Sequence, residues 1–208
     1  MWEVFVFVNP IGQRCLRTEQ AIIDFAKEHH INAHLKFIAL NNFISIDNYL
    51  KNNHYNLRDI NLRNHLTRDI YQATVYYKAA TFQGNKSGRQ FLIDLQHAIN
   101  FQGQNFSVDL VKQIALDNHL DWTSLQQDVQ SELTLNQCLE DQKIASELKI
   151  TNTPTSVIYD YSGSKNKGLC IPNCSQYELH LALNSLLPSS ANDQETKTSA
   201  RPALHLLK

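Results

Sequence analysis

Asn9-Pro-Ile-Gly-Gln-Arg-Cys15 is the stretch of sequence that decides how this chain folds. The run before it, Trp2–Val8, is mostly apolar, with the β-branched and aromatic residues typical of a central strand. After it, the apolar residues within Ala21–Ala26 recur at helical spacing. Gly12 is a permissive residue for the start of that helix. The sequence therefore predicts a strand, a tight loop and a helix that carries Cys15 in its first turn.

A distant stretch, Ile150-Thr-Asn-Thr-Pro154, leads into a second strand-like run. A cysteine in the first turn of a helix, facing a cis proline at the start of a late strand, is typical of thioredoxin-like folds. We therefore predict that the Thr153–Pro154 bond is cis and that its loop approaches Cys15. The redox motif of such folds is Cys-x-x-Cys, and here Gly12 stands in place of its first cysteine.

The predicted order of elements is strand, helix and strand, then helices, then two strands and a helix. The second strand is expected at Ala33–Leu40, the late pair at Ser156–Tyr161 and Leu169–Ile171, and the last helix at Tyr177–Leu187. This is an α/β thioredoxin-like fold with an all-helical insertion, the plan of the DsbA-like branch. The predicted parts are the first half of the thioredoxin-like domain (1–66), the helical insertion (67–149), the second half (150–187) and a tail expected to be disordered (188–208).

Capping residues predict where the helices of the insertion begin. The expected starts are Thr67, Ser107, Asp121 or Thr123, and Thr134. The last of these helices is expected to turn Leu135, Cys138, Ala145 and Leu148 inward. Four aromatic residues of the insertion are candidates for its core or for a partner surface: Tyr76, Tyr77, Phe91 and Trp122.

Composition excludes several classes of protein. The 208 residues carry 19 basic and 20 acidic side chains, so nothing predicts a nucleic-acid binder or a polybasic membrane anchor. No apolar run reaches the length of a membrane span, and no signal peptide is visible, so we expect a cytoplasmic protein. The cysteines, at positions 15, 138, 170 and 174, match no common zinc pattern. We expect Cys170 and Cys174 to be independent thiols, Cys138 to be a small core residue, and no metal or cofactor to be bound.

Several further stretches resemble, in the same order, the YjbH or SpxH family of adaptor proteins from Firmicutes. They are Val6–Pro10, Phe82–Leu92, Leu95–Ala98, Lys143–Glu147, Asn152–Thr155, Gly168–Pro172 and Tyr177–Glu178. The resemblance runs over residues 3 to 187, although members of the family often keep the Cys-x-x-Cys that Gly12 interrupts here. It implies a non-enzymatic adaptor that binds the transcription regulator Spx and promotes its degradation by the protease ClpXP. The implied partners are an Spx-like regulator and ClpX or ClpXP.

Two other functions stay open from the sequence. One is a thiol-disulfide oxidoreductase or glutathione-linked enzyme that uses the single Cys15, and the other is a binding domain whose client is not Spx. Gly12 separates the adaptor from the enzyme, because a two-cysteine exchange cycle needs a second thiol to resolve the mixed disulfide. We therefore expect a redox-inactive adaptor in which Gly12, Cys15, Thr153 and Pro154 occupy vestigial active-site positions.

Overall fold

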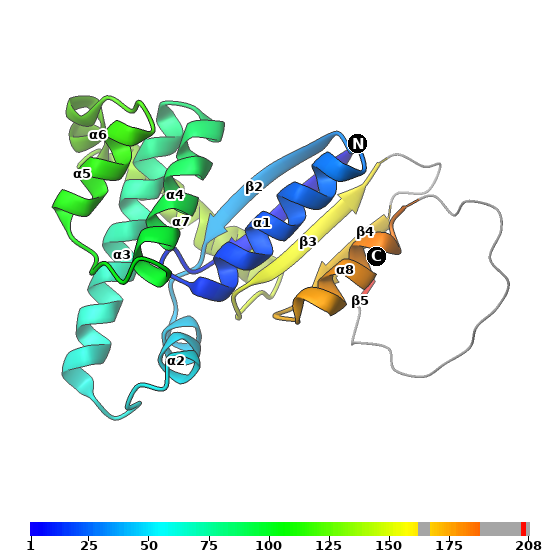
Figure 1. Cartoon of the computed structure of the whole chain (residues 1–208), viewed down its shortest axis with the longest axis horizontal. Coiled ribbons are helices and arrows are strands. Elements are labelled where there is room, and N and C mark those ends of the chain that lie inside the picture. The colour runs from blue at the N-terminus through cyan, green and yellow to red at the C-terminus, as the bar shows by residue number, and fades with distance from the viewer. Residues whose placement is uncertain (162–166, 188–204, 207–208) are drawn as a thin grey trace, which may run out of the picture.

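A computed structural model describes residues 1–161, 167–187 and 205–206 (Figure 1). Its strands form one mixed sheet in the order β2-β1-β3-β4-β5. They are β1 (Trp2–Val8), β2 (Ala33–Ala39), β3 (Thr155–Asp160), β4 (Lys167–Ile171) and β5 (His205–Leu206). β1 runs parallel to β2, and the pairs β1–β3, β3–β4 and β4–β5 are antiparallel. The predicted thioredoxin-like order is confirmed. The tail predicted to be disordered (188–208) lies outside the residues that the structure describes, apart from His205–Leu206, which form β5.

The helices cover both faces of this sheet. They are α1 (Gln13–Glu28), α2 (Phe43–Asn52), α3 (Ile60–Phe82), α4 (Asn85–Asn100), α5 (Val108–Asp117), α6 (Trp122–Val129), α7 (Glu132–Glu147) and α8 (Gln176–Asn184). Val4, Val6 and Val8 alternate along β1 toward the core that includes α1 and α8. Phe7, on the opposite face, packs in a second core with Ala145 of α7. Burial on both faces explains why β1 is a nearly continuous apolar run.

Local capping chemistry sets most helix starts, and two predicted starts are wrong. Ser107 and Asp121 cap α5 and α6 as expected. α3 instead begins after Asp59, whose side chain accepts a hydrogen bond from the Leu62 amide. Thr67 lies inside α3, where its hydroxyl donates to the carbonyl of Arg63. Similarly, α7 begins after Ser131, and Thr134 is its third residue.

The inward face of α7 matches the prediction at Ala145 but not at Leu135. Leu135 is 43% exposed, whereas Thr134, Asp141 and Ala145 are buried. The apolar pattern misleads here because two polar residues on the buried face have partners inside the protein. The Thr134 hydroxyl donates to the Asp128 carbonyl over 2.6 Å, and Asp141 pairs with Lys78 of α3, with 2.5 Å between its Oδ2 and the lysine Nζ. Partners of this kind make burial of polar groups tolerable.

Gly88 allows α3 and α4 to pack closely. A Cβ at this position would lie 2.7 Å from the Thr81 methyl group and 2.9 Å from the Thr81 backbone. Since α3 and α4 form the centre of the insertion, any larger residue at position 88 would force these two helices apart.

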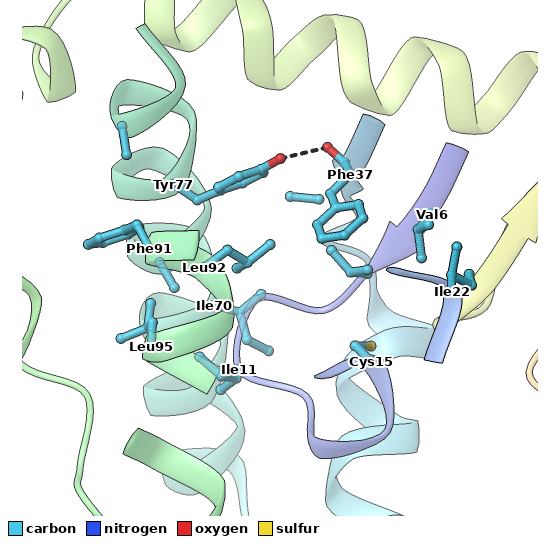
Figure 2. Close-up of a cluster of buried hydrophobic side chains, with 14 of the residues drawn as sticks. Val6, Ile11, Cys15, Ile22, Phe37, Ile70, Tyr77, Phe91, Leu92 and Leu95 are labelled. Carbon is cyan, nitrogen blue, oxygen red and sulfur yellow. Dashed lines mark hydrogen bonds between the residues drawn. The ribbon is translucent and has the colours of Figure 1, made fainter. Parts of the chain in front are cut away.

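Side chains from the insertion cover the outer edge of β2. The Tyr77 hydroxyl of α3 donates to the Phe37 carbonyl over 3.0 Å, which Figure 2 shows as a dashed line. The other contacts run from Arg89 to the Leu35 carbonyl, from the Ala39 amide to Asp141, and from Gln142 to the Ala39 carbonyl. A sheet edge whose backbone groups are already bonded is a poor template for pairing with another strand. Across the part of the chain that the structure describes, no helix combines the length and apolar character needed to cross a membrane.

Candidate functional site

The loop between β1 and α1 holds Cys15 against the end of β1. The Asn9 side chain accepts a hydrogen bond from the Ile11 amide over 3.0 Å, and the Gly12 amide donates to the Asn9 carbonyl over 2.9 Å. These bonds close a tight turn, and α1 begins directly after Gly12. The Asn9 amide in turn donates to Sγ of Cys15 over 3.1 Å. The thiol is thereby directed back toward the sheet.

The loop before β3 lies on the other side of this thiol. The Thr153–Pro154 bond is cis, as predicted. Thr153 is buried and lines a hollow of about 40 Å³ together with Cys15 and Asn48 of α2. The predicted approach of the cis-proline loop to Cys15 is therefore confirmed. The hollow is too small for more than one or two water molecules.

Cys15 has the opposite electrostatics to an activated cysteine. It is 2% exposed and belongs to the main hydrophobic core, where Figure 2 draws it among buried apolar side chains. Burial, and secondly the nearby carboxyl group of Glu19, raise the pKa of this thiol to about 12. Hydrogen bonds from Asn9 and Thr153 act in the opposite direction but do not compensate. Reactive cysteines have pKa values of about 3.5–7.5, so the helix start alone does not activate this thiol.

A buried polar group that the sequence did not predict lies one helical turn after Cys15. Glu19 is completely buried, and burial raises the pKa of its carboxyl group to about 8. Gln96 of α4 donates from Nε2 to Glu19 Oε1 over 3.0 Å and to the Asn9 carbonyl over 3.2 Å. The second carboxyl oxygen of Glu19 and the Gln96 Oε1 have no hydrogen-bond partner within the described residues. The available signal was a glutamate four residues after Cys15 on the apolar face of a predicted helix.

Of the other cysteines, Cys174 borders this site, because its backbone carbonyl accepts a hydrogen bond from Arg14 over 3.5 Å, and Arg14 lines the hollow over Cys15. All four are free thiols, and burial raises the pKa of Cys138, Cys170 and Cys174. Cys138 is half-buried beside the Lys78–Asp141 pair. Among the residues that the structure describes, no group of three or more histidine, cysteine or acidic side chains is arranged to hold a metal ion.

α2, which lines the hollow over Cys15 through Asn48 and Tyr49, begins with exposed apolar residues. Asn42 caps this helix and donates from its side chain to the Thr151 carbonyl over 3.1 Å, which ties α2 to the cis-proline loop. The first two residues of α2, Phe43 and Ile44, are 78% and 45% exposed. Of the four aromatic residues that were candidates for the core of the insertion or for a partner surface, Tyr77 and Phe91 are in the core, and Tyr76 stacks on Trp122 with both half-buried. Phe43 is therefore a better candidate for partner contact than any of these four.

Comparison with known proteins identifies curated sequence relatives and, separately, solved structures of similar fold. The chain is 26% identical over 220 residues to the ClpXP adapter protein SpxH of Bacillus licheniformis, covering 98% of this chain and 71% of the relative. It is 28% identical over 111 residues to the Bacillus subtilis protein of the same name, covering 53% of this chain but only 37% of that relative. The chain therefore spans only part of the length of these curated relatives.

Solved structures show the same fold at lower identity. DsbA2 of Pseudomonas aeruginosa superposes with a TM-score of 0.60 at 14% identity, covering 92% of this chain and 91% of that one. The oxidoreductase NmDsbA1 of N. meningitidis superposes with a TM-score of 0.55 at 13% identity, covering 89% and 81%. The thioredoxin family model matches residues 5–181, which span both halves of the sheet and the helices between them. The chain therefore belongs to the thioredoxin family, with a helical insertion arranged as in the DsbA-like structures.

Proposed function

We propose that this protein is an adaptor that binds an Spx-like transcription regulator in the cytoplasm and promotes its degradation by ClpXP without thiol chemistry. The observation that carries the proposal is the state of Cys15, a thiol 2% exposed with its pKa raised to about 12 and Gly12 three residues before it. Relatives named as ClpXP adapters support the partner and the protease. An adaptor acts by holding a client near the protease, which consumes no thiol.

The surface we assign to the client is the rim formed by α2 and the cis-proline loop. Phe43 and Ile44 offer exposed apolar side chains there. Asn48 donates from its side chain to Oδ1 of Asn152 over 3.1 Å, which holds the helix against the loop beside these anchors. An exposed aromatic anchor on a fixed frame is the usual centre of a protein interface.

The test is degradation of Spx by purified ClpX and ClpP with and without this protein. We expect faster loss of Spx when the protein is present and an unchanged rate with Cys15→Ala. Phe43→Ala is expected to weaken client binding by about 2 kcal/mol or more, which is roughly a 30-fold rise in Kd. Leu139→Ala is the matched control, because Leu139 is 66% exposed on α7 and should leave binding unchanged.

Two results would contradict the proposal. If Spx decays at the same rate with and without the protein, the adaptor function is wrong. If acceleration occurs but disappears in Cys15→Ala, the mechanism depends on the thiol. The oxidoreductase alternative, which the thioredoxin fold leaves open, would then be favoured.

A further inference from the structure

A groove with an aliphatic floor lies along the first half of β2. It is a hollow of about 300 Å³ between α1, β2 and α4, and we call it the β2 groove. Ile23 of α1, Leu35 of β2 and Ile93 of α4 form much of its floor, and each is half-buried. Apolar surface that stays partly open to solvent in a concave site is typical of a binding surface.

The rim of the β2 groove is basic. Lys27, Lys86 and Arg89 line it, and none of the described residues that line it carries a carboxylate. Lys27 pairs with its neighbour Asp24 over 3.6 Å, but both side chains are about three-quarters exposed, so the pair is weak. Neither Lys86 nor Arg89 forms an ion pair with a carboxylate in residues 1–161, 167–187 or 205–206. Their charges are thus available to an anionic partner.

The basic lining continues beyond Arg89. A neighbouring hollow of about 260 Å³ shares Leu35 and Arg89 with the β2 groove and adds the exposed Lys36. Lys78 also lines this hollow, but its charge is already paired with Asp141. Arg89 is held between the two hollows by its hydrogen bond to the Leu35 carbonyl, with 3.3 Å between donor and acceptor. Because the whole chain has a net charge of −1, this concentration of cations is a local property of the β2 edge.

The mode of docking follows from the bonded edge of β2. The carbonyls of Leu35 and Phe37 already accept hydrogen bonds from Arg89 and Tyr77. A partner strand would have to break these bonds, so strand addition is disfavoured. Side chains of a partner can still enter the apolar floor while its carboxylates reach the rim.

We propose that the β2 groove docks an acidic protein segment, with leucine- or isoleucine-type anchors in the floor and aspartate or glutamate side chains against Lys27, Lys86 and Arg89. The groove shares no lining residue with the hollow over Cys15. It is a second interaction surface, and it goes beyond the client rim on α2. Burial of aliphatic side chains supplies the affinity, and the cations supply selection for an acidic partner.

The probe is a fluorescently labelled synthetic helix with leucine at every third and fourth position and glutamate between, titrated with the full chain and followed by anisotropy. Lys27→Glu/Lys86→Glu reverses two exposed rim charges and is expected to weaken binding by about tenfold or more. Lys112→Glu/Lys143→Glu makes the same change in net charge at exposed positions on α5 and α7 and should alter Kd less than about twofold. Methyl resonances of Ile23 and Ile93 should shift on binding.

Several outcomes would overturn the proposal. Equal weakening by the two double variants would show attraction to overall charge alone. Equal binding of a peptide with serine in place of leucine would show that the floor is not used. Methyl shifts confined to other regions would place the peptide elsewhere. Displacement of the peptide by oleate at lower concentration than by unlabelled peptide would make the groove a site for anionic lipids.

Discussion

The burial of Cys15 predicts that its thiol reacts slowly with electrophiles, and the raised pKa sets how much slower than an ordinary thiol it should be. Raising the pKa from 9.0 to about 12 lowers the thiolate fraction at neutral pH by about 1,000-fold. The remaining thiolate is intrinsically more nucleophilic, because reactivity rises with pKa by about 0.4–0.5 logarithmic units per pKa unit, or ~15–30-fold here. The net expectation is a reaction at least ~30-fold slower than that of an ordinary thiol. An exposed fraction of 2% slows it further.

Pulsed alkylation of the unaltered protein measures this rate. Native protein is treated with N-ethylmaleimide for increasing times, quenched, unfolded in urea and labelled with an isotopically heavy form of the reagent. Mass spectrometry then reports each cysteine separately, and Cys138, Cys170 and Cys174 serve as half-buried internal controls. Cys15 should be the slowest of the four in the native protein. In urea all four should react at similar rates.

A native Cys15 that is alkylated as fast as in urea would refute this reasoning. The thiol would then be either accessible or ionised, in conflict with its placement in the core. A rate that is slow but rises steeply as mild urea is added would instead agree with protection by folded structure.

Three further predictions concern the same core. In Gly12→Cys, the new Cβ would lie 3.1 Å from Cys15 Sγ, close to the ~3 Å between a Cβ and the far sulfur of a disulfide. Mild oxidation should therefore remove two titratable thiols, and an unchanged thiol count would contradict this. The Glu19 carboxyl has its pKa raised from 4.5 to about 8 on folding, so its contribution to stability is present below pH 4.5 and is lost as pH rises toward 8. Glu19→Gln should flatten that loss in urea unfolding, and parallel pH profiles for both proteins would count against it. Lys78→Met leaves the buried Asp141 without its cation and should cost about 3–5 kcal/mol of unfolding free energy. Much of this loss should be recovered in Lys78→Met/Asp141→Asn, which removes the charge and keeps an acceptor for the Ala39 amide; no recovery would show that the unpaired charge is not the cause.

Local patterns predicted the plan of the fold. The apolar run of β1, the helical spacing within α1 and the Thr-Pro before β3 each depend on residues a few positions apart. Capping at Ser107 and Asp121 is equally local, since the side chain bonds to an amide three residues on. The order of these elements, together with a cis proline beside a cysteine, was therefore available from the sequence.

Partners distant in sequence decided what local patterns could not. The face that α7 buries depends on the pairing of Asp141 with Lys78, which is 63 positions earlier in the chain. The apolar pattern of the helix alone therefore predicted, wrongly, that Leu135 is buried. The sequence of one helix cannot predict such a pair, because burial of a charge is tolerable only where a partner from another segment is present.

Cys15 shows most clearly which properties the sequence determines and which depend on the tertiary structure. By itself, the sequence determined that Cys15 stands in the first turn of α1, that a glycine and not a cysteine lies three residues before it, and that Pro154 enters a late strand. Its local position favours a lowered pKa through the helix N-terminus. Only the tertiary structure decided that the pKa is raised, because the surrounding core removes the thiol from water and places the Glu19 carboxyl beside it. Desolvation depends on every segment packed around the sulfur, whereas a spacing motif records only its neighbours along the chain.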